Sequence, residues 1–171
     1  MEVVPPPSRV LHAPPPGRQR RREVINLGFS GNGKLDTPLA AVLAEIDAGA
    51  YILDCLPNLD PEGVAERTGP FVESLLGARP DTPVILVEDH PRMSSWLKPD
   101  FQQEHEEKWQ AFKEVYQKLL DSGFKNLHYV KGDKLFGTDN EASMDGVHPS
   151  DLGYMRMADI MEEAMRKALA G

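Results

Sequence analysis

Short apolar segments alternate with longer amphipathic segments from residue 23 to the end of the chain. Each short segment is largely apolar along its length, rather than at every second position, which is typical of a strand that is buried on both faces. The longer segments carry apolar residues at three- and four-residue intervals, as helices with one buried face do. This alternation predicts a parallel sheet with helices on both faces, in a three-layer α/β/α arrangement.

The expected strands place a defined set of loops at one edge of the sheet. In parallel sheets of this kind, ligands bind beyond the carboxyl ends of the strands, so the segments that follow the strands are the place to search for a site. These segments contain a glycine-rich loop, an asparagine, several carboxylates and two histidines. The strands are expected at 24–29, 51–56, 83–87 and 126–130, and the helices at 38–47, 61–78, 101–120 and 150–169.

Residues 1–22 differ from the rest of the chain in composition. They hold six of its fifteen prolines, and five arginines against one acidic residue, Glu2. Because proline removes a backbone donor and blocks helices and central strands, we expect residues 1–22 to form a disordered or extended arm that supplies no strand to the sheet. Residues 23–171 then form the one folded domain. The arginines within 18–22 suggest a nucleic-acid patch, but a solvated tail explains them more simply.

The composition argues against several classes of function. A formal net charge of −8 is unfavourable for a protein that binds the phosphate backbone of nucleic acids. The single cysteine, Cys55, excludes a disulfide framework and a cysteine-rich metal site. No apolar run reaches the length of a membrane span, and the N-terminus lacks the apolar centre of a secretory signal. We therefore expect a cytoplasmic protein that binds neither nucleic acid nor membrane.

The segment Asp145-Gly-Val-His148 lies just before the last expected helix. A carboxylate three residues before a histidine on a turn can bond one ring nitrogen, fix the tautomer and leave the other nitrogen free as a general base. Taken alone, the same spacing is also typical of a turn in which Asp145 caps backbone amides and His148 lies on the surface. At this level both interpretations stand.

Two further segments offer donors to a negatively charged group. Gly28, Gly31 and Gly33 crowd the loop after the first expected strand, so its backbone can turn sharply and present amides to an anion. The spacing matches neither a P-loop nor a dinucleotide fingerprint, which leaves an oxyanion site or a plain turn. Asn58 follows the second expected strand, where its amide can donate to the same oxyanion or cap the helix that begins at Pro61.

Glu88, Asp89 and His90 follow the third expected strand. His90 is a candidate alternative base or half of a metal site. Consecutive side chains diverge along an extended backbone, so the three cannot all bind one ion, and a loop role for His90 is the simpler interpretation. His105 and His128 fall within an expected helix and an expected strand, and we expect both to be structural.

In their order and their placement at strand ends, these segments resemble the SGNH (GDSL-type) family of serine esterases and lipases. The segment 26–32 is similar to the family block whose glycine amide lines the oxyanion hole, and the resemblance implies that role for Gly31. Asn58 matches the asparagine that is a further oxyanion donor in the family, although Pro57 stands where the family usually has glycine. Residues 145–148 are similar to the block that supplies the acid and the base of the triad.

The resemblance extends from residue 23 to the end and is strongest to the small bacterial members that include carbohydrate esterases. It implies a flavodoxin-like fold and hydrolysis of carboxylic esters through a serine acyl-enzyme, with no metal and no organic cofactor. His148 would act as general base and then as acid, and Asp145 would orient it. The implied substrate is a small-molecule ester with a short acyl chain, on a carbohydrate or another small alcohol.

One family block has no counterpart in this sequence. The family carries a Gly-Asp-Ser-like turn after an N-terminal apolar strand, and that block supplies the nucleophile and a central strand of the sheet. The proline- and arginine-rich arm stands in its place, which implies a sheet without the first family strand. The strand at 24–29 is then expected either to pair directly with the strand at 51–56 or to leave a slot for another chain or for the arm.

Ser30 is the candidate substitute nucleophile, because it lies on the glycine-rich loop at the correct edge of the sheet. A seryl oxygen needs a base within about 2.6–3.2 Å, so His148 would have to reach it. Without a substitute nucleophile, hydrolysis should be near background. The alternative is a catalytically silent family member that acts as a binding or assembly module, as a homodimer that covers the exposed edge of the sheet.

Overall fold

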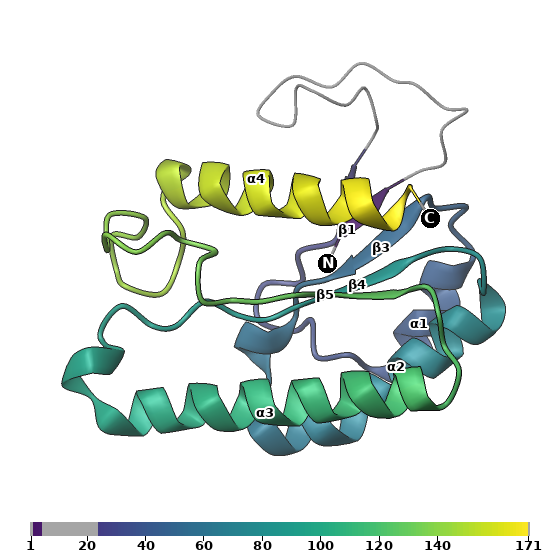
Figure 1. Cartoon of the computed structure of the whole chain (residues 1–171), viewed down its shortest axis with the longest axis horizontal. Coiled ribbons are helices and arrows are strands. Elements are labelled where there is room, and N and C mark those ends of the chain that lie inside the picture. Colours follow the sequence, from purple (N-terminus) through teal and green to yellow (C-terminus); the bar gives the residue numbers. More distant parts are fainter. Residues whose placement is uncertain (1, 5–23, 171) are drawn as a thin grey trace.

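The computed structural model describes residues 2–4 and 24–170. Within these residues, five strands form one sheet in the order β2-β1-β3-β4-β5 (Figure 1). The strands are β1 (Glu2–Val4), β2 (Ile25–Asn26), β3 (Ala50–Leu53), β4 (Val84–Val87) and β5 (Leu127–Val130). β3, β4 and β5 run parallel to one another, whereas β1 is antiparallel to both of its neighbours. Apart from β1, the predicted parallel sheet is confirmed.

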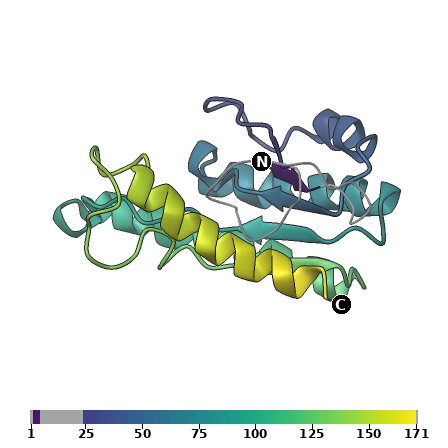
Figure 2. The ribbon, with the colours of Figure 1, turned by 90° about the horizontal axis from the view of Figure 1, so that it is seen from above.

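Helices cover both faces of the sheet and form the predicted three layers. α1 (Thr37–Ala44), α2 (Pro61–Ala78) and α3 (Pro99–Asp121) lie on one face, and α4 (Asp151–Ala168) lies on the other (Figure 1, Figure 2). Two short 3₁₀ helices, η1 (Leu56–Asn58) and η2 (Ser95–Leu97), follow β3 and β4. Among the described residues, no helix combines the length and the apolarity that a membrane span requires.

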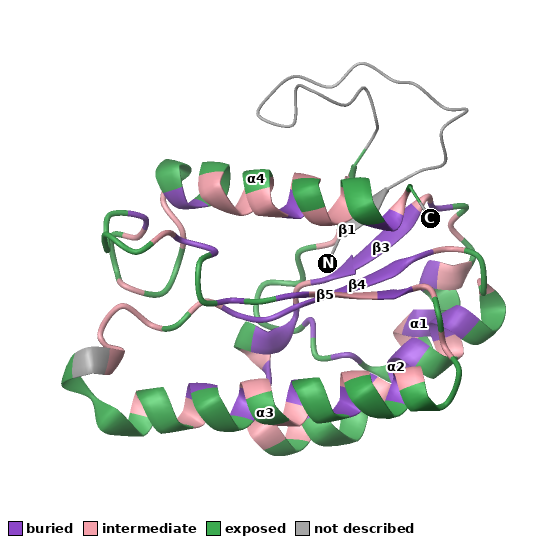
Figure 3. Cartoon of the chain, in the orientation of Figure 1, coloured by how far each residue is buried: buried purple, intermediate pink, exposed green. Residues whose placement is uncertain are grey.

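β3 and β4 are buried along their whole length (Figure 3), because their alternate residues pack in different hydrophobic clusters on the two faces of the sheet. In β4, Val84 and Leu86 pack with α1, α2 and α3, whereas Ile85 and Val87 pack with α4. All four side chains are fully buried. This burial from both sides explains why the segments of β3 and β4 are apolar throughout.

β1 fills the position between β2 and β3, where it pairs with Ile25 and Asn26 on one side and with residues 50–52 on the other. β2 and β3 therefore do not pair directly, and the slot expected between them is taken by residues of the arm. The expectation that the arm supplies no strand is wrong at Glu2–Val4, where the chain has two valines and no proline. The rest of the predicted arm, residues 1 and 5–22, lies outside the described residues.

Local hydrogen bonds set the boundaries of the elements that flank the site. β2 is shorter than predicted, because Oδ1 of Asn26 accepts a hydrogen bond from the Gly28 amide at 2.9 Å and turns the chain out of the sheet. α2 begins where predicted, because Oδ1 of Asp60 accepts from the Gly63 amide at 2.8 Å and Pro61 occupies the first helical position.

Candidate functional site

The turn before α4 brings Asp145 and His148 together, and residues 145–148 are called the acid–histidine turn. Oδ2 of Asp145 lies 2.7 Å from Nδ1 of His148. Because a carboxylate only accepts hydrogen bonds, Nδ1 carries a proton, and in the neutral ring Nε2 then has the lone pair. The side chains of His148 and Asp145 are 81% and 57% exposed, and Nε2 has no partner among the residues that the structure describes.

Backbone amides complete the acid–histidine turn. Oδ1 of Asp145 accepts from the amides of Val147 at 2.9 Å and His148 at 2.7 Å, and Gly146 takes a φ of +79°, which glycine adopts without strain. The pKa of Asp145 lies well below its ordinary value, because the His148 ring and these amides donate to its carboxylate. Asp145 therefore stays ionised, caps the turn and holds the imidazole in one orientation.

Ser30 and Gly31 form the tip of an exposed turn after β2. The Asn32 amide donates to the Phe29 carbonyl at 3.0 Å, and φ is +47° at Ser30 and +84° at Gly31. A positive φ at a serine is uncommon, and strained residues of this kind cluster at functional sites. In the part of the chain that is described, neither the Ser30 hydroxyl nor the Gly31 amide has a hydrogen-bond partner, so both are free to meet a ligand.

Asn58 connects the loop after β3 to the glycine-rich loop. It lies in η1, and its Nδ2 donates to the Gly33 carbonyl at 3.4 Å, which is long for a hydrogen bond. The two loops that carry the predicted oxyanion donors therefore touch. A primary amide has two hydrogens, so Asn58 keeps one for a ligand.

The structure places the predicted site residues in two groups. Ser30, Gly31 and Asn58 form one group, and Asp145 and His148 form the other. Within the described ranges, no hydrogen bond or ion pair joins the two groups. Each group lies in loops that follow the carboxyl ends of parallel strands, the edge at which ligands bind in such sheets.

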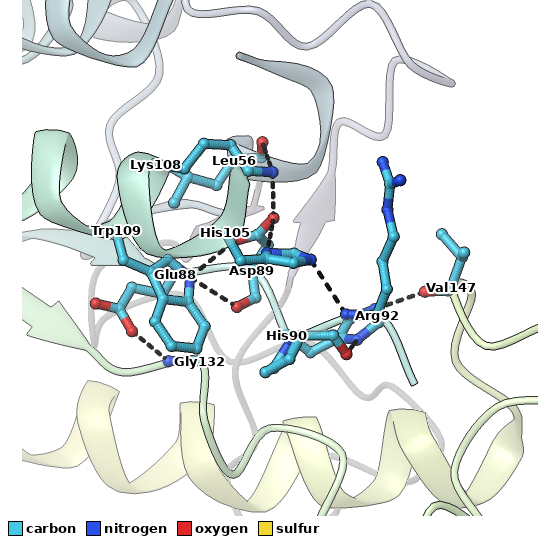
Figure 4. A network of polar contacts seen from close by, with 11 residues as sticks. Leu56, Glu88, Asp89, His90, Arg92, His105, Lys108, Trp109, Gly132 and Val147 are labelled. Carbon is cyan, nitrogen blue, oxygen red and sulfur yellow. Dashed lines mark hydrogen bonds and ion pairs between the residues drawn. The ribbon is translucent and has the colours of Figure 1, made fainter. Parts of the chain in front are cut away.

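A buried polar network follows β4 (Figure 4). Glu88 and Asp89 are only 1% and 3% exposed. Glu88 accepts from the Gly132 amide at 2.8 Å and from the Tyr129 hydroxyl at 2.5 Å, and burial together with the Glu88 carboxylate raises the pKa of Tyr129. The side chains of Glu88, Asp89 and His90 diverge as predicted, toward β5, α3 and the acid–histidine turn respectively.

Asp89 is the centre of this network. Its Oδ2 lies 2.5 Å from Nζ of Lys108, which is 3% exposed, and its Oδ1 accepts from Nε1 of Trp109 at 2.8 Å. Nδ1 of His105 lies 3.3 Å from Oδ2, off the direction of a good hydrogen bond. Burial alone would raise the pKa of Asp89, but His105 and Lys108 outweigh burial, and the pKa lies below its ordinary value.

The close approach of Gly132 to Asp89 gives a prediction on stability. A Cβ at Gly132 would lie 1.9 Å from the Asp89 carbonyl oxygen, so we expect Gly132→Ala to lower the free energy of unfolding in urea by about 2–4 kcal/mol. Gly77→Ala is the matched control, because a Cβ at Gly77 in α2 meets nothing within 4 Å and should add about 0.5–1 kcal/mol of stability. Equal effects of the two substitutions would contradict this packing.

His90 is not available as a general base. Its Nδ1 faces the Pro91 carbonyl at 2.9 Å and its Nε2 faces the Val147 carbonyl at 2.5 Å, while the ring stacks on Phe136 with the centroids 3.6 Å apart. Burial lowers the pKa of His90 below its ordinary value, against the opposite effect of the two carbonyls. His90 therefore has the predicted loop role, and its contact with Val147 ties that loop to the acid–histidine turn.

Lys108 and Trp109 are not identified from the sequence as partners of Asp89, although their spacing in the sequence indicates that they share a helical face. Together with His105 they occupy positions i, i+3 and i+4 of α3, which places three polar groups on one helical face. No spacing could reveal the contact of His90 with Val147, because the two residues are 57 positions apart. Among the described residues, no three or more His, Cys, Asp or Glu side chains form a group that could hold a metal ion.

A cavity of about 450 Å³ lies beside His90. The loop after β4, residues 90–95, and the loop after β5, residues 132–140, form its walls. Asp133 and Ser95 line it, and the Ser95 hydroxyl is buried without a hydrogen-bond partner among the described residues. The volume suits a small-molecule ligand. Because His90 both lines the cavity and contacts Val147, the cavity adjoins the acid–histidine turn.

Comparison with known proteins relates this arrangement to a family. The sequence model of the GDSL-like lipase/acylhydrolase family matches residues 11–166. Among solved structures, a protein from Bacteroides ovatus ATCC 8483 assigned as a GDSL-like lipase is 40% identical in sequence, with a TM-score of 0.81 over 85% of this chain and 43% of that chain. No curated protein matches the sequence significantly.

Two further structures share the fold alone. A salicylyl-acyltransferase from a tetracycline biosynthetic pathway is 18% identical, with a TM-score of 0.60 over 79% of this chain and 42% of that chain. A family 3 carbohydrate esterase from Clostridium thermocellum is 18% identical, with a TM-score of 0.53 over 78% of this chain and 65% of that chain. The present chain thus spans less than half the length of the Bacteroides ovatus protein and of the acyltransferase.

Proposed function

This chain belongs to the GDSL-like lipase/acylhydrolase family, and from that membership we propose that it hydrolyses carboxylic esters through a serine acyl-enzyme. The ester carries a short acyl chain, on a carbohydrate or another small alcohol. One observation carries the proposal. The Asp145 carboxylate lies 2.7 Å from Nδ1 of His148 and leaves Nε2 open, which is the arrangement that a general base in acyl transfer needs.

His148 makes both proton transfers in this mechanism. Nε2 removes the proton from the nucleophilic hydroxyl as the hydroxyl oxygen bonds to the ester carbonyl carbon, and it then gives that proton to the departing alcohol. Water repeats the sequence on the acyl-enzyme and releases the carboxylic acid. Asp145 stays ionised and stabilises the imidazolium, in keeping with its lowered pKa.

Ser30 is the proposed nucleophile. Its turn conformation, with a φ of +47°, resembles the strained turns on which other hydrolases expose a serine. The Gly31 amide and the Asn58 side-chain amide are the proposed oxyanion donors. Attack requires the Ser30 oxygen to come within about 2.6–3.2 Å of Nε2 of His148, so the glycine-rich loop and the acid–histidine turn must close around the ester.

The cavity beside His90 supports a small polar alcohol as the leaving group. Its wall offers the Asp133 carboxylate and the unpaired Ser95 hydroxyl, which suit the hydroxyl groups of a carbohydrate. The proposed steps use no metal and no organic cofactor, because each proton moves between the chain, the ester and water.

A catalytically silent binding or assembly module is the second candidate. The family resemblance places a serine-bearing strand between β2 and β3, and the strand at that position, β1, contains no serine. In this case the chain binds an ester-like ligand without turning it over, or pairs with a second copy at the edge of the sheet.

Ser30→Ala tests the nucleophile directly. We expect the purified S30A variant to hydrolyse p-nitrophenyl acetate more slowly by on the order of a hundredfold or more, because the acyl-enzyme route needs the hydroxyl. Ser122→Ala is the matched control, since that hydroxyl bonds the Lys118 carbonyl at the end of α3, and its rate should equal that of the wild type. An unchanged rate in S30A would exclude Ser30 as the nucleophile.

A further inference from the structure

The loop after β4 contacts the acid–histidine turn at two points. Nε2 of His90 lies 2.5 Å from the Val147 carbonyl oxygen, and the Met93 amide donates to the Gly146 carbonyl at 3.0 Å. Both carbonyls belong to the two central residues of the turn. We propose that His90 is a positioning residue, whose ring holds the acid–histidine turn in place and thereby sets the position of His148.

The acid–histidine turn depends on support from outside. Its internal hydrogen bonds, made by Asp145, shape the turn but do not fix where it lies relative to the sheet. Its two functional side chains are largely exposed, so packing does little to hold them. A bridge between Ser143 and Pro149 closes the base of the turn, and the contacts from residues 90 and 93 hold its tip.

The ring of His90 is itself held in one orientation. It stacks on Phe136 at an interplanar angle of 20°, and Phe136 is buried. Nδ1 lies 2.9 Å from the Pro91 carbonyl, and this contact and the one with Val147 are both hydrogen bonds only in the imidazolium, because the neutral ring has a single N–H. Because a carbonyl oxygen only accepts, the contact with Val147 requires a hydrogen on Nε2. That hydrogen is present both on the imidazolium and on the neutral ring protonated at Nε2.

The backbone that carries His90 is anchored to α3 (Figure 4). The Arg92 amide donates to Nε2 of His105 at 3.1 Å, and the buried Asp89 carboxylate binds side chains of the same helix. A continuous series of contacts therefore runs from α3 through residues 89–93 to the acid–histidine turn. The final step combines one side-chain contact and one backbone contact, so a substitution at residue 90 isolates the side-chain contribution.

His90 touches no reacting atom in this arrangement, and its influence reaches His148 through Val147. Its effect on turnover rests on the proposed hydrolase function, whereas its effect on the turn does not. The two effects can therefore be measured separately.

Three variants distinguish the contribution of the N–H donor of His90 from that of its aromatic ring. His90→Phe keeps an aromatic ring over Phe136 but has no donor, and His90→Gln keeps an N–H donor on a flexible side chain. His128→Phe is the matched control, because His128 is a half-buried histidine of β5 whose side chain has no hydrogen bond among the described residues. Should H90F not fold, His90→Ala takes its place in the comparison with H90Q.

The first readout is the rate at which backbone amides of the folded protein exchange with solvent, measured by NMR. We expect H90F to raise the exchange rates at Met93, Val147 and His148 about tenfold, as the loss of one hydrogen bond to a well-placed carbonyl predicts. H90Q should stay within about threefold of the wild type, and H128F should not differ from it. Wild-type exchange rates in H90F would overturn the positioning role, as would H90Q amides that exchange as fast as those of H90F.

The second readout is the hydrolysis of p-nitrophenyl acetate. H90F should lower kcat about tenfold and leave KM within about twofold, because His148 is displaced while the ester still binds. Altered exchange in H90F together with no hydrolysis by the wild type would refute the proposed function and support the positioning role. Hydrolysis by the wild type together with unaltered exchange in H90F would overturn the positioning role and leave the proposed function intact.

Discussion

Replacing His148 by alanine is expected to slow the hydrolysis of p-nitrophenyl acetate by a factor on the order of 10²–10⁴, the usual contribution of a positioned general base. Without Nε2, no group of the acid–histidine turn can take the proton from the attacking hydroxyl. Asp145 cannot substitute for the imidazole, because its lowered pKa makes it a weak base. Initial rates at saturating ester, measured for the variant and the wild type, give the factor directly.

Two further variants test whether the loss of activity in H148A is specific to His148 and its partner Asp145. His128→Ala removes a histidine from β5 that has no part in the proposed chemistry, and its rate should match that of the wild type. Asp145→Asn keeps the size of the side chain but no longer favours the proton on Nδ1, so it should also lose most of the activity. A rate for H148A within about threefold of the wild type would contradict the assignment of His148 as general base.

Replacing Asp89 by asparagine is expected to lower the free energy of unfolding by about 3–5 kcal/mol, the usual cost of breaking a buried ion pair on one side. The Lys108 ammonium is 3% exposed and has Asp89 as its charged partner at 2.5 Å. Asparagine can still accept from Trp109, but it leaves the buried ammonium without a counter-charge. Urea denaturation followed by circular dichroism measures the loss.

The control for Asp89 removes both charges. Lys108→Met in the D89N background should recover part of the lost stability, because the uncompensated ammonium is then absent. Glu163→Gln, which breaks an exposed ion pair with Lys167 in α4, should cost no more than about 0.5 kcal/mol. A loss of less than about 1 kcal/mol in D89N would contradict a buried, charged Asp89–Lys108 pair.

The contribution of the Asp89–Lys108 pair to the free energy of unfolding decreases as the pH falls. Because the pKa of Asp89 is lowered in the folded protein, its ionised form contributes stability that is fully present above the unfolded value of about 3.9 and is lost as the pH falls through the folded value. D89N lacks this titration. Its stability should therefore fall less steeply than that of the wild type on the acid side of pH 4.

The strands and the long helices could be predicted from the sequence because their determinants are local. Ile85 and Val87 face α4 while Val84 and Leu86 face the other layer, and this burial on both sides leaves an uninterrupted apolar segment in the sequence. The predicted helix at 61–78 matches α2 at both ends, because its start is marked by a capping aspartate and a proline.

β1 could not be predicted, for a physical reason. Three residues with two valines are too short to show a pattern, and the pairing that makes them a strand comes from Ile25 and Ala50, far along the chain. The prolines that follow residue 4 do not exclude a strand at Glu2–Val4, because proline constrains only its own position and the residue before it.

The site shows the same division between local and distant contacts. Asp145 and His148 are three residues apart, a spacing that fits both a hydrogen bond between the side chains and a turn in which Asp145 caps backbone amides, and the structure contains both sets of contacts. The contact between Asn58 and Gly33 follows only once parallel strands bring the two loops to one edge. The contact between His90 and Val147 joins loops with no pattern in common, and only the folded structure reveals it.

Labelling with a fluorophosphonate probe tests whether His148 activates Ser30 as a nucleophile, because the probe reacts with a serine only when a base has activated it. We predict a covalent adduct in the wild type, located on Ser30 by peptide mapping, and no adduct in H148A or S30A. Folded wild-type protein that acquires no adduct under conditions that label a known serine hydrolase would contradict the proposed acyl-enzyme and favour the catalytically silent module.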